Sequence, residues 1–285
     1  MPQVTISMPV WRTPPELLHR AIRAVHAQTF TDWQLLVIGD GCAPAYPLDH
    51  ELIADDRIKL VTLDVNRGRY YCDAVAFAAT ESPWFTIHDS DDHAEPDWLA
   101  RMVDLGAWAS ADAVLAPQLV QRLGSGRPML ERIEPYRGFK RLQHHAHMAG
   151  LWSRRWLGEL GGPHPGFRVG FDTFLTSLPY VVGKMAVARE PLYNRVKRHG
   201  SLTTSAETGM RSEHRRVARE ALERMWLEVL RIRADMIDWP LPVVERLPRA
   251  RHLIAQVLTG YPDADGYAEL RESVDRDAKR ITDLI

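Results

Sequence analysis

The sequence predicts an α/β fold, with helices on both faces of a mainly parallel β-sheet and a helical C-terminal extension. Over the first 95 residues, apolar runs typical of strands alternate with longer segments whose apolar residues recur at helical spacing. The strand segments are continuously apolar, which indicates strands buried on both faces. Strands that alternate with helices are typical of a parallel sheet with right-handed crossovers.

The predicted elements of this first part follow one another closely. A helix is expected to begin after Thr13, because the two prolines that follow are tolerated in a first helical turn, and it continues to Gln28. A second helix is expected over residues 70–79. The four expected strands are residues 4–10, 33–38, 57–63 and 84–88.

The middle and the end of the chain differ in character from this part. The predicted strands of the middle are residues 113–123, 148–152 and 181–188, and its predicted helices are residues 155–160 and 171–178. The last quarter is charged and helical, with expected helices at residues 212–236, 249–258 and 266–285. We therefore expect one domain over residues 1–208 and a helical region over residues 209–285.

The composition excludes several classes of function. The 285 residues carry 36 Lys and Arg against 37 Asp and Glu, so no general charge attracts nucleic acid or an anionic membrane. Cys42 and Cys72 are too few for a disulfide framework or a cysteine-based zinc site. The N-terminus lacks the pattern of a signal peptide, and no stretch approaches the ~20 apolar residues of a membrane span. We therefore expect a cytoplasmic protein without a transmembrane segment.

Acidic residues directly follow two of the predicted strands. Asp40 follows the second strand, and Asp89, Asp91 and Asp92 follow the fourth. In open parallel sheets, ligands bind beyond the carboxyl ends of the strands. Crowded carboxylates repel one another unless a cation or solvent compensates, and oxygen-rich groups suit Mn²⁺ or Mg²⁺. A solvated acidic turn is the alternative, but the buried strand before the cluster favours a ligand site.

Five motifs follow one another in a specific order. They are VTISMPVWRTPPELLHRAIRAVHAQTFTDWQLLVIGDGC, NRGRYYCDAV, WFTIHDSDDHAEPDWL, a Gly-Gly pair at 161 with an acidic residue at 172, and RVKRHGSLTTS. In this order they resemble the family 2 glycosyltransferases, which have the Rossmann-like GT-A fold. The resemblance implies an inverting, metal-dependent transfer of a sugar from a nucleotide diphosphate sugar. It also implies that about residues 1–95 bind the donor and about residues 96–208 the acceptor.

The resemblance assigns several residues to the nucleotide. It implies that Pro9 and Val10 line the nucleotide cleft and that Asp40 accepts a hydrogen bond from a base N–H. Uracil offers such an N–H, so a UDP-sugar such as UDP-GlcNAc or UDP-Glc is favoured, and dTDP is chemically compatible. Arg67 or Arg69 is implied to contact the base or a phosphate. Asp40 is otherwise a turn residue, since Asp-Gly is a common turn pair.

The same resemblance implies a site for Mn²⁺ or Mg²⁺ at the DxD motif. Asp89 is implied to hold the ribose or a metal-bound water, and Asp91 to coordinate the metal that bridges the two phosphates. Asp92 is expected to support these ligands from behind. His199 resembles the C-terminal histidine that supplies a further metal ligand in GT-A enzymes.

Charged residues are also assigned to the leaving group and to the acceptor. Arg195 and Arg198 are expected to stabilise the departing nucleoside diphosphate. Asp172 is the candidate general base, which takes the acceptor proton while the nucleophile attacks the anomeric carbon opposite the diphosphate. A helix N-cap is the alternative role of Asp172, because Asp is favoured at that position.

Two further groups of residues have a structural and a functional interpretation. The histidines of residues 143–147 (QHHAH) are expected to form an acceptor-side wall or plain surface, because no Cys or acid completes a zinc set. Trp11, Trp152 and Trp156 either stack on sugar or acceptor rings or pack in the core, which is the commoner fate.

Two other functions are compatible with parts of this pattern. A nucleotidyltransferase also uses a parallel sheet and acidic metal ligands, but MPVWRTPPE lacks the Gly-rich loop and Lys that such an enzyme normally shows. A noncatalytic sugar-nucleotide sensor or assembly partner is the second alternative, with the C-terminal helices as the surface of a homodimer. For a transferase, we expect an acceptor hydroxyl or amine on a small bacterial natural product or on a carrier-bound intermediate, by analogy alone.

Overall fold

Seven strands form the central sheet in the described part of the chain. The computed structural model describes residues 1–42, 50–124, 127–133, 142 and 149–283. The strands, in their order across the sheet, are β10 Met185–Val187, β6 Ala113–Leu115, β9 Leu151–Ser153, β4 Trp84–Ile87, β1 Val4–Val10, β2 Trp33–Asp40 and β3 Ile58–Leu63. Neighbouring strands run parallel, except that β9 is antiparallel to both β4 and β6. The predicted mainly parallel sheet is confirmed.

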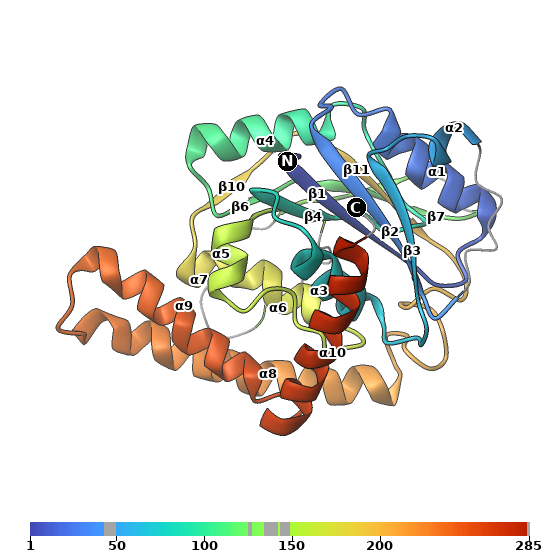
Figure 1. The fold of residues 1–285 in the computed structure, drawn as a ribbon. Helices are drawn as coiled ribbons and strands as arrows, with labels where there is room; N and C mark the ends of the chain where they lie inside the picture. Colours follow the sequence, from blue (N-terminus) through green and yellow to red (C-terminus); the bar gives the residue numbers. More distant parts are fainter. Residues whose placement is uncertain (43–49, 125–126, 134–141, 143–148, 284–285) are drawn as a thin grey trace.

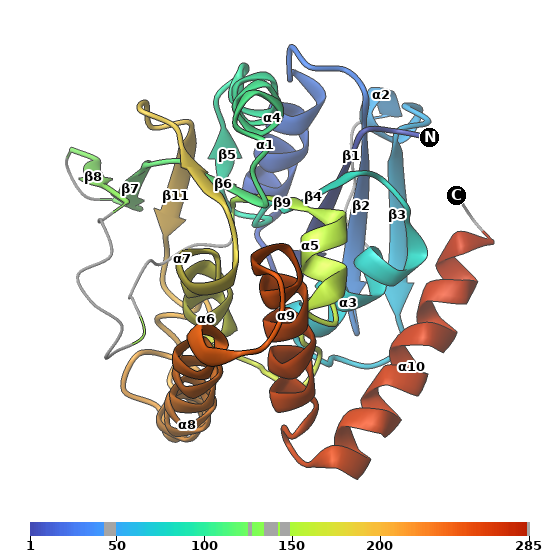
Figure 2. The same ribbon diagram turned by 90° about the vertical axis from the view of Figure 1, so that its left-hand side faces the viewer.

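Helices cover both faces of this sheet, as predicted (Figure 1). The helices nearest the sheet are α1 Pro15–His26, α3 Arg69–Ala79, α4 Trp98–Ala109 and α5 Arg154–Glu159. Leu35 of β2 belongs to the apolar cluster formed with α1 and α4, and Leu36 to the cluster formed with α3 and α5. The two clusters lie on opposite sides because successive side chains of a strand point to opposite faces. Figure 2 shows the two layers on either side of the strands.

A second, smaller sheet brings a late segment of the chain beside the acidic cluster. Its strands, in spatial order, are β5 His93–Ala94, β11 Tyr193–Lys197, β7 Gln118–Arg122 and β8 Met129–Glu131. Asn194 of β11 pairs antiparallel with His93, which directly follows Asp92. This pairing is what places the Arg-rich segment after Tyr193 next to Asp91 and Asp92.

Two predicted strands of the middle region were wrong in part. Residues 113–123 form two strands in different sheets, β6 and β7, because the chain leaves the central sheet at Pro117, which has no N–H to donate to a ladder. Residues 181–188 begin in the helix α7 Pro179–Val182, and only β10 is a strand. Pro179 stands at the start of α7, where the fixed φ of proline fits a first helical turn.

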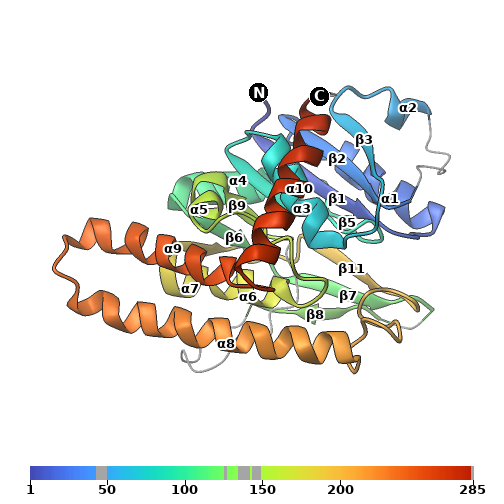
Figure 3. The same cartoon turned by 60° about the horizontal axis from the view of Figure 1, so that its bottom comes forward.

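Three long helices follow the smaller sheet, close to their predicted positions. They are α8 Glu213–Asp235, α9 Val243–Thr259 and α10 Ala264–Thr282, with a 3₁₀ turn, η1, at Met236–Asp238. α9 begins six residues before the predicted helix and contains Pro248. α8 and α9 form a hairpin, and α10 lies against α3 (Figure 3).

These helices share the apolar cluster of α3, α5 and the short helix α6 Phe171–Ser177. Leu222 and Trp226 of α8, Ile254 of α9 and Ile281 of α10 are all buried in it. Within the described residues, no helix is both long and apolar enough to cross a membrane. Pairing of two copies through these helices stays a prediction.

Candidate functional site at the carboxyl edge of the sheet

The carboxyl ends of β1, β2 and β4 meet at one edge of the central sheet. Val10, the last residue of β1, pairs with Gly39, so Asp40 ends β2 beside it. On the other side of β1, Ser7 pairs with Ile87, two residues before Asp89. The predicted meeting of the acidic strand ends is therefore present. Val10 itself is buried in the core, whereas Pro9 is half-buried.

The Asp40 carboxylate ties β2 to the loop in front of α3. It is 3% exposed and accepts hydrogen bonds from the backbone N–H groups of Arg67, at 2.7 Å, and of Gly68, at 2.9 Å. Burial raises its pKa, while these two hydrogen bonds act in the opposite direction. A carboxylate offers about four lone pairs, so two backbone donors leave acceptor capacity for a base N–H. Arg67 lies over the ring of Tyr71.

Asp89 is paired with Arg69, the first residue of α3. The Arg69 Nη1 lies 2.8 Å from Asp89 Oδ1, and its Nε lies 3.9 Å from the buried carboxylate of Asp73. Asp73 in turn accepts a 2.7 Å hydrogen bond from the Ser7 hydroxyl on β1, and burial raises its pKa to about 7. The backbone N–H of Asp89 donates to the Tyr193 hydroxyl. The strand end is thus held by α3 on one side and by β11 on the other.

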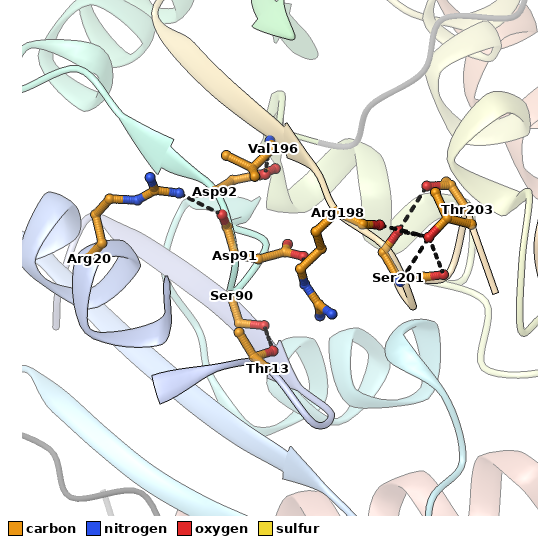
Figure 4. A network of polar contacts seen from close by, with 10 residues as sticks. Thr13, Arg20, Ser90, Asp91, Asp92, Val196, Arg198, Ser201 and Thr203 are labelled. Atoms are coloured by element: carbon orange, nitrogen blue, oxygen red, sulfur yellow. Dashed lines mark hydrogen bonds and ion pairs between the residues drawn. The ribbon is translucent and has the colours of Figure 1, made fainter. Parts of the chain in front are cut away.

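Asp91 and Asp92 are held from β11 in different ways (Figure 4). Asp91 Oδ2 lies 2.8 Å from Nε of Arg198, while Asp92 is buried and its Oδ1 accepts a 2.6 Å hydrogen bond from the backbone N–H of Val196. Burial, followed by the neighbouring carboxylates of Asp92 and Asp89, raises the pKa of Asp91 to about 6. The Arg20 guanidinium, reaching from α1, donates to the Asp91 backbone carbonyl. Asp92 therefore anchors the smaller sheet, and Asp91 presents its carboxylate to the site.

The residues after β11 close one side of this edge. Arg195 is half-buried on β11, whereas His199 is exposed in the turn that follows. Hydroxyl hydrogen bonds between Ser201, Thr203 and Thr204 organise the next turn, as Figure 4 shows. Arg198 lies beside the acidic cluster through its contact with Asp91, and its expected role at the diphosphate stays a prediction.

The donor set fits a divalent cation only with the help of a ligand. No three His, Cys, Asp or Glu side chains of the described residues come together as a metal-binding group. Burial, and after it the carboxylates of Asp92 and Asp89, raises the pKa of Asp91, and a cation at this carboxylate would offset that repulsion. Mg²⁺ is commonly held by one or two carboxylates together with substrate phosphates, and Asp91 is placed for that arrangement.

Asp172 lies at the start of α6 and contacts Tyr70 of α3, the residue next to the Arg69 that pairs with Asp89. The N-cap of α6 is Gly170, with φ of 85°, and Asp172 is the second residue of the helix, so the alternative N-cap role was wrong. Gly fits this position because it adopts positive φ without strain. The Tyr70 hydroxyl donates to Asp172 Oδ1 at 3.1 Å and accepts from the Asp172 backbone N–H at 3.2 Å.

Several contributing residues were missed from the sequence. Arg20, Tyr70 and Tyr193 each bond one of the predicted acidic residues. Arg20 and Tyr70 lie on predicted helices, but their contacts depend on how those helices pack, and Tyr193 lies on β11, which was not predicted. Trp152 and Trp156 stack on each other in the core, which confirms core packing for both, while Trp11 is 40% exposed. The histidines of residues 143–147 lie outside the described residues.

A cavity of about 790 Å³ lies at the opposite, amino-terminal edge of the central sheet. Trp84 at the start of β4, Asp112 before β6 and Arg154 at the start of α5 line it. None of the predicted site residues lines this cavity. We place the candidate site at the carboxyl edge because the acidic strand ends gather there.

Comparison with known proteins identifies the family of this chain. Residues 5–193 match the model of Glycosyl transferase family 2. The chain is 32% identical over 111 residues to the succinoglycan biosynthesis protein ExoO of Rhizobium meliloti (strain 1021). That stretch is 39% of this chain and 32% of ExoO, so the match spans about a third of the relative.

Solved structures of S. aureus TarS have a similar fold. TarS 1–349 in complex with UDP has a TM-score of 0.56 at 14% identity, and its complex with UDP-GlcNAc has the same score at 16% identity. Both comparisons cover 98% of this chain and 90% of the TarS chain, whereas a longer TarS chain is covered to 41%. The family match extends over β1 to the start of β11 and includes every acidic strand end described above. The chain therefore belongs to glycosyl transferase family 2 and has the GT-A fold.

Proposed function

We propose that this glycosyltransferase moves a sugar from a UDP-sugar to an acceptor hydroxyl or amine with inversion at the anomeric carbon, assisted by Mn²⁺ or Mg²⁺. The observation that carries the proposal is the grouping of Asp40, Asp89 and Asp91 around the end of β1, with Asp172 held opposite by α3. Asp40, Asp89 and Asp91 are placed to bind the donor, and Asp172 is placed to act on the acceptor.

The donor residues divide between those that bind the nucleobase and those that bind the diphosphate. Asp40 accepts the imide N–H of uracil, and the TarS complexes with UDP and UDP-GlcNAc support uridine as the nucleoside. Asp91 would hold the cation, with His199 as a further ligand, and Asp89 would lie beside the ribose. Arg195 and Arg198 bind the diphosphate oxygens by charge-assisted hydrogen bonds. The bound cation supplies neutralisation of the charge that builds on the leaving group.

Asp172 acts on the acceptor. Its carboxylate takes the proton of the acceptor O–H or N–H while the acceptor atom forms a bond to the anomeric carbon. The bond from that carbon to the diphosphate oxygen breaks on the opposite face, and the nucleoside diphosphate leaves with the electron pair. The acceptor is a small natural product or a carrier-bound intermediate.

Calorimetric titration tests the donor half of the proposal. UDP and dTDP are titrated into the wild type and into Asp91→Ala, each with and without Mn²⁺. We expect metal-dependent binding of UDP that Asp91→Ala weakens by more than about 10-fold, since a lost metal ligand removes the bridge to the phosphates. Asp97→Ala is the matched control, because Asp97 is exposed and pairs only with Arg101 among the interactions described for its side chain.

The products of donor turnover separate the alternatives. A transferase releases UDP from UDP-GlcNAc slowly when water replaces the acceptor. Binding without any turnover indicates a sensor, and release of pyrophosphate from a nucleotide indicates nucleotidyl transfer. If neither nucleotide binds under any metal condition, the proposed donor is wrong.

A further inference from the structure

Two consecutive residues at the start of α3 reach opposite halves of the proposed site. Arg69 contacts Asp89 on the donor side at 2.8 Å, and Tyr70 contacts Asp172 on the acceptor side at 3.1 Å. Tyr70 and Asp172 lie 102 residues apart in the sequence, so only the packing of α6 against α3 brings them together. The first turn of α3 therefore links Asp89, on the proposed donor side, to Asp172, the proposed general base.

The Tyr70 hydroxyl makes two hydrogen bonds to the same residue. It donates to Asp172 Oδ1 and accepts from the Asp172 backbone N–H, so it holds both the side chain and the first turn of α6. The Tyr70 ring is 2% exposed and packs edge-on against Phe171, with 5.8 Å between ring centroids. Both contacts restrict the rotation of the phenol and hold its oxygen at Asp172.

The phenol is suited to act as a permanent donor. Burial, together with the Asp172 carboxylate, raises the pKa of Tyr70 well above its ordinary value. The Tyr70 hydroxyl therefore stays protonated at every working pH, and its O–H remains a hydrogen-bond donor to the Asp172 carboxylate.

We propose that Tyr70 is a positioning residue that orients Asp172 for proton abstraction, engaging Oδ1 so that Oδ2 faces the acceptor. This inference rests on the proposed function, in which Asp172 is the base. A hydrogen bond to a charged group that is lost from a reacting residue lowers a rate by about 10- to 100-fold. Tyr70→Phe is expected to leave donor binding unchanged, because it keeps the aromatic ring that the Arg69 guanidinium lies over, at 5.4 Å from the ring centroid.

Tyr71 provides a matched control on the same helix. Its ring is also buried, and its hydroxyl also donates to a carboxylate, Asp277 Oδ2 on α10, at 2.8 Å. Tyr70→Phe and Tyr71→Phe thus each remove one phenol–carboxylate hydrogen bond from α3. Only the first removes it from Asp172, so any general loss of stability is shared by both variants.

The experiment measures UDP release from UDP-GlcNAc as a function of pH, with water as the acceptor. We expect Tyr70→Phe to lower kcat about 10- to 100-fold with an unchanged donor KM. We also expect the acidic limb of its rate profile to move to higher pH, because the ionised base has lost a hydrogen-bond donor. Tyr71→Phe keeps the wild-type kcat and profile.

A double-mutant cycle separates positioning from a structural effect. If Tyr70 acts through Asp172, then Tyr70→Phe has no further effect on the residual rate of Asp172→Asn. If the rate reductions of Tyr70→Phe and Asp172→Asn multiply in the double variant, the inference is overturned. It is also overturned if Tyr70→Phe and Tyr71→Phe have equal rates. If Asp172→Asn keeps the full rate, or the wild type releases no UDP, the proposed function is wrong and this inference falls with it.

Discussion

The donor side and the acceptor side of the site are held by different forces. We call the ends of β2 and β4 with Asp40, Asp89 and Asp91 the donor edge, and residues 161–172 the base segment. The donor edge is held by ion pairs and by hydrogen bonds from backbone N–H groups. The base segment is held by aromatic packing: the ring of Phe167 stacks on Tyr261 at 4.0 Å between centroids.

This difference assigns distinct tasks to the two parts of the chain. The residues that hold the donor edge come from β1, α1, α3 and β11, all before residue 200. The base segment instead rests on the C-terminal helices, because His164 bonds the Leu258 carbonyl of α9 and contacts Tyr267 of α10. The C-terminal helices therefore support the segment that carries Asp172, the proposed base, and changes in the two regions are expected to alter different steps.

The largest expected effect is the loss of the base. In Asp172→Asn the side chain no longer accepts a proton, and we expect kcat for sugar transfer or donor hydrolysis to fall about 10²- to 10⁴-fold. UDP affinity, measured by calorimetry, is expected to stay within about twofold, because Asp172 lies outside the donor edge. A rate near that of the wild type would remove Asp172 from the mechanism.

The donor edge was predictable from the sequence and the support of the base was not. Asp40 and the Asp89 cluster follow apolar strands directly, and strand ends of a parallel sheet meet at one edge whatever the loops do. The partners of Asp172 depend instead on how α3, α6 and α10 pack. Tyr70 and Tyr71 look alike in the sequence, yet one bonds Asp172 and the other Asp277.

The strands of the middle region failed for a similar physical reason. β11 has the sequence YNRVK, and its three polar residues leave no apolar run that would predict a strand. It nevertheless anchors Asp92. α4 shows apolar residues at helical spacing, Trp98, Leu99, Met102 and Val103, but no element was assigned to it. Short strands without an apolar run, such as β11, are therefore the elements of this site that hydrophobic periodicity does not predict.

A core substitution within the base segment has the next largest expected effect. Phe167 is 1% exposed between Tyr261 and Phe171, and Phe167→Ala is expected to lower the free energy of unfolding by about 3–5 kcal/mol. We also expect a lower kcat with little change in UDP affinity below the melting transition, because the base segment shifts and the donor edge does not.

Met102→Ala is the matched control for this substitution. Met102 is fully buried on α4, in the apolar cluster on the other face of the sheet. It is expected to cost about 2–5 kcal/mol of stability without a specific loss of kcat. Equal losses of kcat in the two variants would contradict a separate support for the base.

The same region is expected to respond to acid. Burial of its ring lowers the pKa of His164 from its ordinary 6.5 to about 4, while its hydrogen bond to the Leu258 carbonyl acts in the opposite direction. The unfolded chain therefore takes up this proton first, so the stabilisation is complete above pH 6.5 and is lost as the pH falls toward 4. The loss amounts to at most about 3 kcal/mol.

Denaturant unfolding at several pH values measures this dependence. The difference in unfolding free energy between pH 7.5 and pH 4.5 is expected to be smaller in His164→Gln than in the wild type. An identical pH dependence in the two proteins would show that His164 is not the group that titrates. UDP affinity at pH 7.5 is expected to be equal in both, because His164 lies in the base segment.

The smallest expected effect concerns the contact between α10 and the end of β3. Arg280 lies 3.2 Å from Asp64 and donates to the Thr62 carbonyl at 2.7 Å, but both charged side chains are exposed. Exposed ion pairs contribute less than about 1 kcal/mol, so Arg280→Ala is expected to lower stability by no more than that. Asp64 lies three residues before Arg67, so this contact ties α10 to the segment that leads into the donor edge. If UDP affinity nevertheless falls more than about threefold in Arg280→Ala and is restored in Arg280→Lys, α10 also supports the donor edge, and the division between the two regions is wrong at this point.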